Sequence, residues 1–381
     1  MDFSLSEEQV ELRRMVRDFA RREVTPAQQQ MDRDHDFPYE TWKKWSDLGM
    51  PGILIPQQYG GSGLDSLTYI LAMEEIGAVS QTFALIWQVH VMVANMYVHL
   101  GTSEQKEKWL PRFASGQNLG AFALTEAGAG SDAGGLRTRA VQDARGNWIL
   151  NGNKIFISNA GTRISDGTVV MATTGEQEGR KAISCFIVPT GTPGYSLGQS
   201  FDKMAWHGMD NRELVFNDCK VPAASLLGEE GKGLRQALGG LNLGRIVFGT
   251  LGGALAQACL DEALPYTKER KQFGKSLSDF QITQAKLANM ATSAEATRSF
   301  ARYVAWLHAL GRDCHTEAAM VKLMGTKLAI ESASDAYQLH GGYGFMHDYR
   351  VNRLYREAQI LAIGEGTNEV QQMLIARALG C

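Results

Sequence analysis

Apolar residues recur every three or four positions through most of the first 120 residues, which is the spacing of amphipathic helices. The Ser-Glu-Glu-Gln sequence at residues 6–9 predicts the start of the first helix, since a hydroxyl cap and acidic side chains suit exposed backbone N–H groups. Residues 52–56 are expected to form a short buried segment. Further helices are predicted from residue 66 to about residue 76 and from about residue 104, the latter ending before residues 117–118.

Residues 76–103 contain no Asp, Glu, Lys or Arg, so their composition approaches that of a membrane span. Gln81, Gln88, His90, Asn95 and His99 interrupt the stretch, and each of these side chains is costly in a bilayer core. We therefore expect a helix that is buried on most sides within the protein, and no membrane partner.

Short runs of β-branched and aromatic residues replace the helical pattern from about residue 121 to residue 230. Such runs occupy residues 168–172, 183–188 and 213–216, and residues 149–157 are predicted to form two strands around an Asn151-Gly152 turn. Strands at this spacing, bounded by turn residues, favour a sandwich or barrel over alternating β–α units.

Helical spacing returns after the glycine-rich residues 228–233 and continues to the C-terminus. Helices are predicted at residues 234–270, 279–310, 317–339 and 367–379, and four long amphipathic helices favour a bundle. The predicted fold class is therefore α+β: an N-terminal α-helical domain (1–120), a middle β-barrel or sandwich domain (121–230) and a C-terminal four-helix bundle (231–381).

The composition narrows the possible functions. The 381 residues include 38 Lys and Arg against 41 Asp and Glu, so the basic excess that is typical of nucleic-acid binding is absent. The five cysteines are scattered without a C-x-x-C pair, and the first residues are acidic where a targeting peptide would be basic. We expect a cytoplasmic protein in a reducing compartment.

Several common site motifs are incomplete. Residues 128–133 satisfy G-x-G-x-x-A, but an extended segment follows where a dinucleotide-binding motif needs a helix. The Gly-Lys-Ser at residues 274–276 lacks the first glycine of a P-loop, and the histidines do not cluster as metal ligands do. No G-x-S-x-G nucleophile motif occurs. Metal and hydrolytic chemistry therefore have no support in the sequence.

Three polar segments remain, at residues 124–132, 270–274 and 364–369. Taken singly, each is compatible with an ordinary structural role: a turn, a solvated connection between helices, and a helix cap with acidic residues nearby. Their functional interpretation depends on their occurring together.

Together these segments resemble motifs of the acyl-CoA dehydrogenase family, in the same order along the chain. L-T-E-A-G-A-G-S-D at residues 124–132 resembles the family's T-E-P-G-A-G-S-D, and K-I-F-I-S-N-A at residues 154–160 resembles K-x-W-I-T-N. E-R-K-Q-F-G-K at residues 269–275, Q-L-H-G-G-Y-G at residues 338–344 and G-E-G-T-N-E-V-Q at residues 364–371 resemble its R-x-x-F-G, Q-x-x-G-G-x-G and E-G-T segments. The resemblance implies FAD, an acyl-CoA substrate, a homotetramer built as a dimer of dimers, and an electron-transfer flavoprotein as electron acceptor.

The resemblance also implies roles for individual residues. Glu365 matches the base that removes the α-proton of the thioester, before the β-hydrogen leaves as hydride to flavin N5. Burial would raise the pKa of such a carboxylate toward the working pH. The backbone N–H of Glu365 and a ribityl hydroxyl of FAD would polarise the thioester oxygen. Branched-chain members carry the base in L-x-x-E-R instead, and here Gly244 stands at that position, before Arg245, which favours Glu365.

The cofactor and substrate contacts follow in the same way. The implied FAD contacts are Phe122, Leu124, Thr125, Gly130, Ser131, Phe156, Ser158, Thr367 and Glu369, joined from a neighbouring subunit by Arg270, Gln272, Phe273, Gln281, Gln338 and Gly342. The implied CoA contacts are Ser131, Asn242 and Arg245.

The sequence departs from the family pattern at three positions. Phe156 replaces a Trp and keeps the stacking surface, and Ser158 replaces a Thr and keeps the hydroxyl. Gly364 replaces a Tyr beside the base, which suggests a wider pocket for a branched, cyclic or bulky acyl group. No role is assigned to Trp206 and His207.

Three alternatives to a dehydrogenase remain open at this point. They are an enoyl-CoA reductase with the same fold, an oxidase that passes electrons to O₂, and a catalytically silent flavin-binding subunit. The presence of Glu365 argues against the last, because a silent subunit needs no base.

Overall fold

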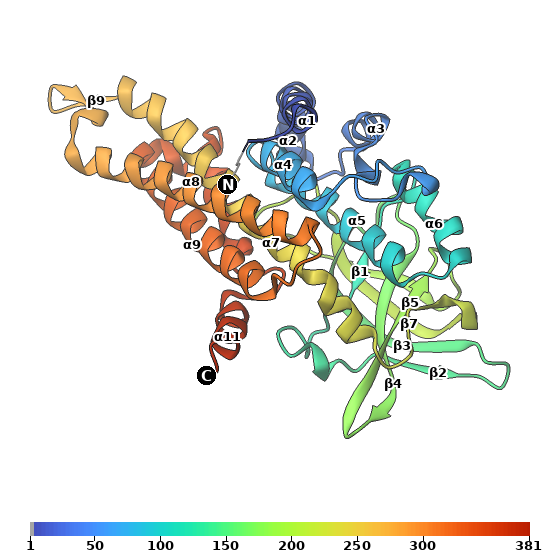
Figure 1. The fold of residues 1–381 in the computed structure, drawn as a ribbon. Coiled ribbons are helices and arrows are strands. Elements are labelled where there is room, and N and C mark those ends of the chain that lie inside the picture. Colours follow the sequence, from blue (N-terminus) through green and yellow to red (C-terminus); the bar gives the residue numbers. More distant parts are fainter. Residues whose placement is uncertain (1–3) are drawn as a thin grey trace.

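The computed structural model describes residues 4–381, which form a helical N-terminal part, a β-sheet and a helical C-terminal part in chain order (Figure 1). The predicted α+β class is confirmed. The N-terminal helices are α1 (Glu7–Phe19), α2 (Thr25–Asp34), α3 (Tyr39–Asp47), α4 (Ser66–Gly77), α5 (Gln81–Leu100) and α6 (Ser103–Ala114).

Helix α1 begins at the predicted cap. The Ser6 hydroxyl accepts the Gln9 backbone N–H, and the Gln9 side chain accepts the Ser6 N–H, each at 3.2 Å. Aromatic side chains form the interior beneath α3, α4 and α5. The Trp87 ring lies 5.0 Å from Trp45 and 4.9 Å from Tyr69, with both pairs close to perpendicular, an arrangement that favours aromatic packing.

The uncharged stretch at residues 76–103 spans the end of α4 and all of α5. Ser80 ends the connection between them, because its hydroxyl accepts the Phe83 N–H at 2.9 Å and caps α5. Helices α5 and α7 (Gly233–Glu269) are each long and apolar enough to cross a bilayer, but 67% and 89% of their most apolar windows are buried in the protein. Burial inside the protein explains their composition.

The middle part is a mixed eight-stranded sheet in the order β6-β7-β3-β2-β4-β5-β8, with β1 pairing in parallel with β4. The sheet curls, because Trp148 of β3 packs on Phe186 of β5 (ring centroids 5.1 Å apart) across two intervening strands. Its other face packs on α5 and α6. The strands are β1 (Phe122–Ala123), β2 (Arg139–Gln142), β3 (Trp148–Ser158), β4 (Thr168–Gln177), β5 (Arg180–Val188), β6 (Tyr195–Ser200), β7 (Asn211–Val221) and β8 (Leu226–Leu227).

The prediction of two strands around an Asn151-Gly152 turn is wrong, because β3 runs through this sequence without reversing. Gly152 lies at φ +146° against Thr138 of the neighbouring segment, and a Cβ there would come within 2.5 Å of the Thr138 hydroxyl. The β3–β7 register shifts at this point, so the glycine accommodates an irregularity within a continuous strand.

The C-terminal part contains α7, α8 (Gln281–Ala309), α9 (His315–His340), α10 (Arg350–Leu361) and α11 (Asn368–Ala378). Helices α7 and α9 approach closely at Gly252 and Gly325, where a Cβ on Gly252 would lie 2.4 Å from the Gly325 carbonyl oxygen. Helix α10 was not predicted from the sequence. This short helix packs on α7 and α9 and buries Val351 and Leu354, whereas α11 projects from the end of the bundle (Figure 1).

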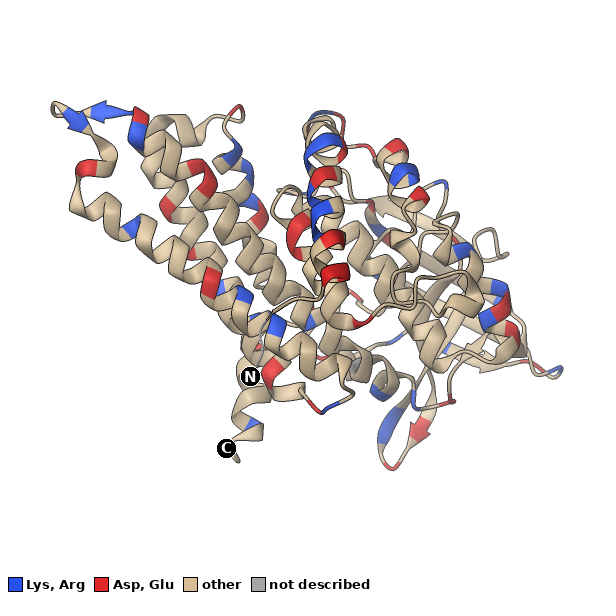
Figure 2. Ribbon diagram, turned by 45° about the horizontal axis from the view of Figure 1, so that its top comes forward, with Lys and Arg blue, Asp and Glu red and all other residues tan. Residues whose placement is uncertain are grey.

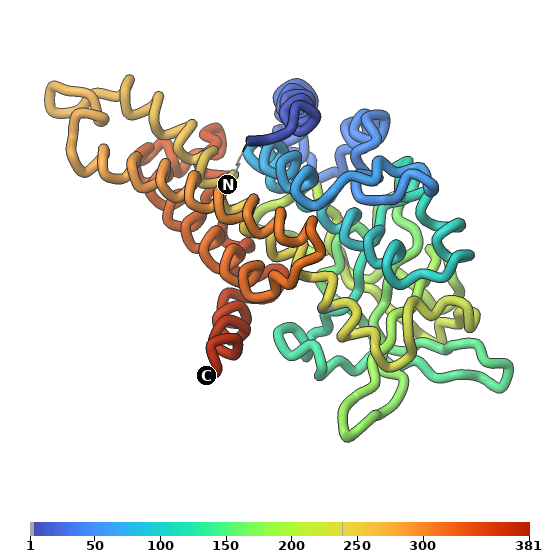
Figure 3. Tube along the Cα trace, viewed as in Figure 1, coloured from blue at the N-terminus to red at the C-terminus, as the bar shows by residue number. Residues whose placement is uncertain are grey.

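A two-stranded hairpin, β9 (Lys271–Gln272) and β10 (Lys275–Ser276), joins α7 to α8. It lies at the tip of the helical bundle farthest from the sheet, as the chain trace in Figure 3 shows. Phe273 at its turn is 93% exposed. The hairpin is therefore far from the eight-stranded sheet of its own chain (Figure 1).

Ion pairs join the N-terminal helices to the C-terminal bundle. Glu74 of α4 binds Arg298 and Arg302 of α8, whereas its neighbour Glu75 binds Arg13 and Arg17 of α1 within the N-terminal part. Elsewhere, basic and acidic residues alternate over the ribbon, as along α1 (Figure 2). The charges therefore tie the two helical parts together.

Candidate active site

Glu365 lies in the loop between α10 and α11. Its backbone adopts the left-handed conformation at φ +54°, which is uncommon for a residue with a Cβ and often marks a functional site. Gln371 of α11 holds this loop in place, because its amide donates to the carbonyl oxygens of Glu365 at 3.2 Å and Gly366 at 2.9 Å. The loop is therefore fixed by a fully buried side chain of α11.

Lys322 of α9 anchors the same loop from the other side. Its ammonium group donates to the Ala362 carbonyl at 3.2 Å and to Asn368 Oδ1 at 3.0 Å. The side chain is fully buried, and burial lowers the pKa of Lys322 to about 8 although the carboxylate of Glu365 opposes the shift. Lys322 thus supplies both an anchor and a positive charge near the loop.

The carboxylate of Glu365 points inward against α5 and α7. Gln88 Nε2 donates to Glu365 Oε1 at 3.1 Å. A Cβ on Gly244 would lie 3.0–3.1 Å from the two carboxylate oxygens. Burial raises the pKa of Glu365, while the Gln88 hydrogen bond and the charges of Arg245 and Lys322 lower it in part. The structure therefore brings together Glu365 and Gly244, the two alternative positions for a base.

A cavity of about 490 Å³ opens beside this carboxylate. Gln88 and Gly244 line it, together with Asn242 and Phe122 from the predicted binding segments. Apolar side chains of α5, among them Val91 and Met92, line the rest. The lining combines an apolar wall with a few polar groups, as binding cavities for small molecules do.

Arg245 is 95% buried and directly follows Gly244, which lines this cavity. Its Nη1 atom donates to Asn242 Oδ1 at 3.0 Å and lies 3.3 Å from His315 Nδ1, while its Nε atom has no partner among the described residues. The two predicted CoA contacts on α7 are therefore adjacent, whereas Ser131 lies on an exposed loop beside the sheet.

The expectation of free space beside Gly364 is wrong. The Phe248 ring of α7 fills that space, since a Cβ on Gly364 would lie 2.8 Å from Phe248 Cε1. The space next to Gly364 is therefore occupied by an aromatic ring from another helix. The sequence pattern of the loop contains no signal for this long-range contact.

The predicted flavin loop lies where β1 leads toward β2. Glu126 holds it, because its carboxylate accepts the backbone N–H groups of Arg137 at 2.6 Å and Thr138 at 2.9 Å. Lys154 of β3 is fully buried and donates to Glu126 Oε1 at 2.7 Å and to the Leu124 carbonyl at 3.0 Å. Burial lowers the pKa of Lys154 to about 8, with Glu126 opposing the shift. This ion pair fixes the loop on β3.

The neighbouring residues leave an open cradle. A Cβ on Gly128 or Gly130 would meet nothing within 4 Å, so the loop presents bare backbone. Phe156 of β3 is 58% exposed, and its ring lies 5.0 Å from that of Phe201, tilted by 51°. Ser158, two residues on, accepts the Asn211 amide at 3.2 Å. A bare loop beside an exposed aromatic ring and a hydroxyl suits a planar, phosphate-bearing cofactor.

The remaining predicted FAD contacts do not join this cradle within one chain. Arg270, Gln272 and Phe273 belong to the hairpin at the far end of the bundle, and Gln281 begins α8 beside it. Gln338 and Gly342 lie at the end of α9 and in the turn after it, while Thr367 caps α11 and precedes Glu369. Six of these eight residues are the contacts that the resemblance assigns to a neighbouring subunit, and Thr367 and Glu369 are the two that it assigns to the same chain.

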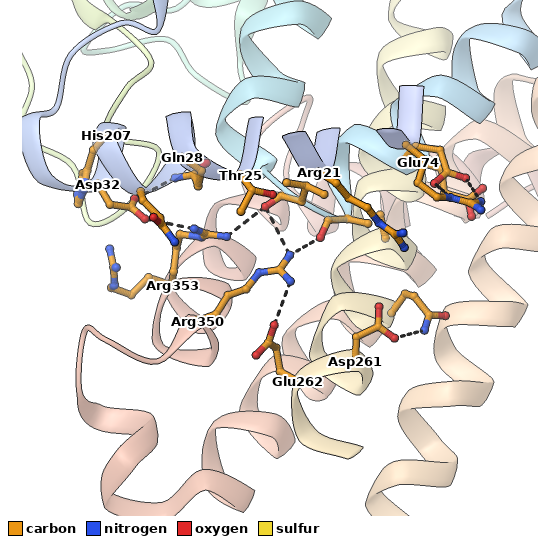
Figure 4. A pocket seen from close by; sticks show the side chains of 18 of the residues that line it. Arg21, Thr25, Gln28, Asp32, Glu74, His207, Asp261, Glu262, Arg350 and Arg353 are labelled. Carbon is orange, nitrogen blue, oxygen red and sulfur yellow. Dashed lines mark hydrogen bonds and ion pairs between the residues drawn. The ribbon is translucent and has the colours of Figure 1, made fainter. Parts of the chain in front are cut away.

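A second cleft, of about 1160 Å³, lies between α2 and the helices α7 and α10 (Figure 4). Most of its charged side chains are paired, such as Arg350 with Glu262 and Arg353 with Asp32. His207 lines it and stacks on His35 with the ring centroids 4.0 Å apart, and Trp206 is buried in the adjacent core. The structure places both residues in packing contacts between the loop before β7 and the N-terminal helices.

Comparison with known proteins decides the family. Models of the acyl-CoA dehydrogenase N-terminal, middle and C-terminal domains match residues 6–117, 121–219 and 231–380. The chain belongs to the acyl-CoA dehydrogenase family. An acyl-CoA dehydrogenase of Bacillus subtilis (strain 168) is 44% identical over 98% of both chains. Butyryl-CoA dehydrogenase from Megasphaera elsdenii aligns over 100% of both chains, with 39% identity and a TM-score of 0.96.

A chain from a structure of the electron transferring flavoprotein of Acidaminococcus fermentans is 40% identical, with a TM-score of 0.95, over 100% of this chain and 99% of that one.

As its family and its relatives show, this acyl-CoA dehydrogenase is an FAD-dependent oxidoreductase that dehydrogenates an acyl-CoA thioester. The open cradle around Gly130 and Phe156 fits the flavin. Bound FAD supplies the acceptor for a hydride from the acyl chain.

Several residues at the site of this dehydrogenase were not predicted from the sequence. They are Gln88 at the carboxylate, Lys322 below the loop and Phe248 beside Gly364. Only Gln88 carried a visible signal, as a polar residue in an otherwise apolar stretch. The others act through contacts between distant parts of the chain.

Proposed function

We propose that Glu365 is the base that removes the α-proton of the bound acyl-CoA. This proposal rests on the contacts of its carboxylate with Gln88 and Gly244, which both line the 490 Å³ cavity. A raised pKa suits a general base, because proton transfer is most efficient when the pKa of the base is near the working pH. Gly244 leaves the alternative position without a carboxylate.

The backbone N–H of Glu365 is proposed to polarise the thioester oxygen. No hydrogen bond occupies this N–H within residues 4–381, whereas the carbonyl of the same residue accepts from Gln371. A fixed, unpaired donor stabilises negative charge that develops on the oxygen. Arg245, Asn242 and Ser131 are proposed as the CoA contacts; the unpaired Nε atom of Arg245 offers a further donor near the cavity.

We further propose that the enzyme assembles as a homotetramer, a dimer of dimers. The hairpin residues Arg270, Gln272 and Phe273 reach a flavin only in another subunit, because they lie at the opposite end of their own chain from the cradle. The 93% exposure of Phe273 supports this proposal, since a large apolar side chain at a turn is favoured when it is covered.

An electron-transfer flavoprotein is proposed as the electron acceptor, in keeping with the similarity to a chain from the Acidaminococcus fermentans structure. A cytoplasmic location is proposed from the cysteines. Cys185, Cys219, Cys259 and Cys314 are buried and free, as is usual in a reducing compartment.

An absorbance spectrum of the purified protein, repeated anaerobically with a panel of acyl-CoA thioesters, tests the reaction. A flavin band that one class of saturated thioester bleaches would support dehydrogenation and identify the acyl group. A reduced flavin that only enoyl-CoA reoxidises, with no response to saturated thioesters, would instead support the reductive direction. Peroxide formation in air would support an oxidase.

The variant Glu365→Gln tests the base. It keeps the shape of the side chain, so the yellow colour and the fold are expected to remain. Turnover is expected to fall by several orders of magnitude because no group replaces the carboxylate. Turnover near that of the unmodified enzyme would show that the base lies elsewhere.

A further inference from the structure

Gln88 is buried in the cavity wall, where the fold itself does not require a polar side chain. The side chain is 2% exposed, and its Oε1 atom has no partner among the described residues. Its one hydrogen bond within residues 4–381 is the donation from Nε2 to Glu365 Oε1 at 3.1 Å. A buried amide with an unpaired oxygen destabilises the fold relative to an apolar side chain of similar size. The contact with Glu365 therefore accounts for its presence.

The carboxylate also determines how the amide is turned. An ionised carboxylate accepts hydrogen bonds and cannot donate, so only the NH₂ end of Gln88 suits the side facing Glu365. In return, this N–H favours the ionised form of Glu365 and fixes one of its two oxygens. The other oxygen, Oε2, remains available for a proton.

Other groups around Glu365 act more diffusely. Arg245 on α7 and Lys322 on α9 favour the carboxylate through their charges, and neither donates a hydrogen bond to it. Tyr69 on α4 is fully buried nearby, and its hydroxyl has no partner. Gln88 on α5 is therefore the direct donor to the carboxylate among the described residues.

We propose that Gln88 is a positioning residue for the catalytic base: its amide N–H holds Glu365 Oε1, keeps the carboxylate ionised in the free enzyme and turns Oε2 toward the substrate. The proposal rests on the role of Glu365 as base. Gln88 itself exchanges no proton with the substrate.

The test is the variant Gln88→Met in the FAD-loaded enzyme, which keeps the length of the side chain and removes the donor. Loss of the hydrogen bond is expected to raise the pKa of Glu365. The acid limb of the pH profile of kcat/KM should then move to higher pH by about one unit. Activity on the acid side of the profile then falls about tenfold, with a smaller loss on the alkaline plateau. Infrared titration of the carboxyl band that Glu365→Gln removes should show the same shift without substrate.

Gln81→Met is the matched control on the same helix. Gln81 is also fully buried, but its amide donates to the carbonyls of Gly77 at 2.9 Å and Leu251 at 3.1 Å, away from the base. This variant is expected to lower the free energy of unfolding and to leave the pH profile unchanged. Gln88→Glu, which places a second carboxylate beside Glu365, is expected to raise the acid limb further than Gln88→Met does.

An acid limb and an infrared titration that do not move in a folded Gln88→Met enzyme would overturn the proposal. So would an equal shift in Gln81→Met. If Glu365→Gln retains turnover, the base assignment itself fails. If Glu365→Gln is inactive while Gln88→Met titrates like the unmodified enzyme, only the role of Gln88 fails.

Discussion

The substitution Gly244→Ala adds one methyl group directly against the carboxylate of Glu365. The new Cβ would lie 2.9 Å from the carboxylate carbon and 3.0–3.1 Å from its oxygens, whereas ordinary contacts begin at 3.4 Å. The carboxylate must therefore move by roughly 0.4 Å or turn away from Gln88, because the packed backbone of α7 cannot easily shift. A displacement of about 1 Å from the reactive geometry costs on the order of 10²-fold in rate. We expect the rate of flavin reduction to fall about tenfold or more.

The assay is the anaerobic bleaching of the flavin band by the best thioester, followed in a stopped-flow instrument. Replacing a helical glycine by alanine favours the helix by about 1 kcal/mol, so the free energy of unfolding should not fall appreciably. Gly253→Ala on the same helix is the control, because its Cβ would crowd Thr297 at 3.0 Å, on α8. That variant should lose stability and keep its rate. Full-rate flavin reduction in Gly244→Ala would refute the view that the position of this carboxylate limits the reaction.

Further predictions concern the groups around the site. Lys154→Met leaves Glu126 unpaired in the interior, so we expect about 3–5 kcal/mol lower stability and loss of flavin on gel filtration; retained flavin at unchanged stability would contradict the role of this pair. Phe248→Ala removes the ring beside Gly364 and should raise kcat/KM for isovaleryl-CoA relative to butyryl-CoA, and an unchanged ratio would place the specificity elsewhere. Because burial raises the pKa of Glu365, ionisation of this carboxyl lowers the stability of the folded protein above pH 4.5. The free energy of unfolding of Glu365→Gln should therefore exceed that of the unmodified protein at pH 8 but not at pH 4. A variant as stable as the unmodified protein at both pH values would argue against a raised pKa. Phe273→Asp should weaken both subunit association and flavin retention, as measured by sedimentation and absorbance, and a fully loaded tetramer would count against the shared site.

The elements that the sequence predicted well are those whose signals are local. The cap at Ser6 and Gln9 formed as expected, and the helix predicted at residues 234–270 corresponds to α7. Both depend on residues within a few positions of one another. Helix α10 was missed because its 12 residues are rich in charged and polar side chains and its burial comes from packing on α7 and α9.

The errors at residues 149–157 and at Gly364 have the same origin. Asn151-Gly152 is a strong hairpin signal in isolation, yet pairing with both β2 and β7 keeps β3 extended. The missing ring at Gly364 suggested a vacancy, but Phe248, more than 100 positions away in the sequence, fills it. Motifs located Glu365 and the flavin loop; the neighbours that set their chemistry come from other helices.

The separation of the hairpin from the cradle has a genetic consequence. In the proposed assembly, each chain contributes the base and cradle of one site and the hairpin of another. When one chain has a defective base and its partner a defective hairpin, both defects fall in one site and the other site has neither. A chain with Glu365→Gln and a chain with a disabled hairpin, each inactive alone, would form some intact sites when produced together. Restored activity in such mixtures, in a proportion set by random assortment of the chains, is what a site divided between subunits requires.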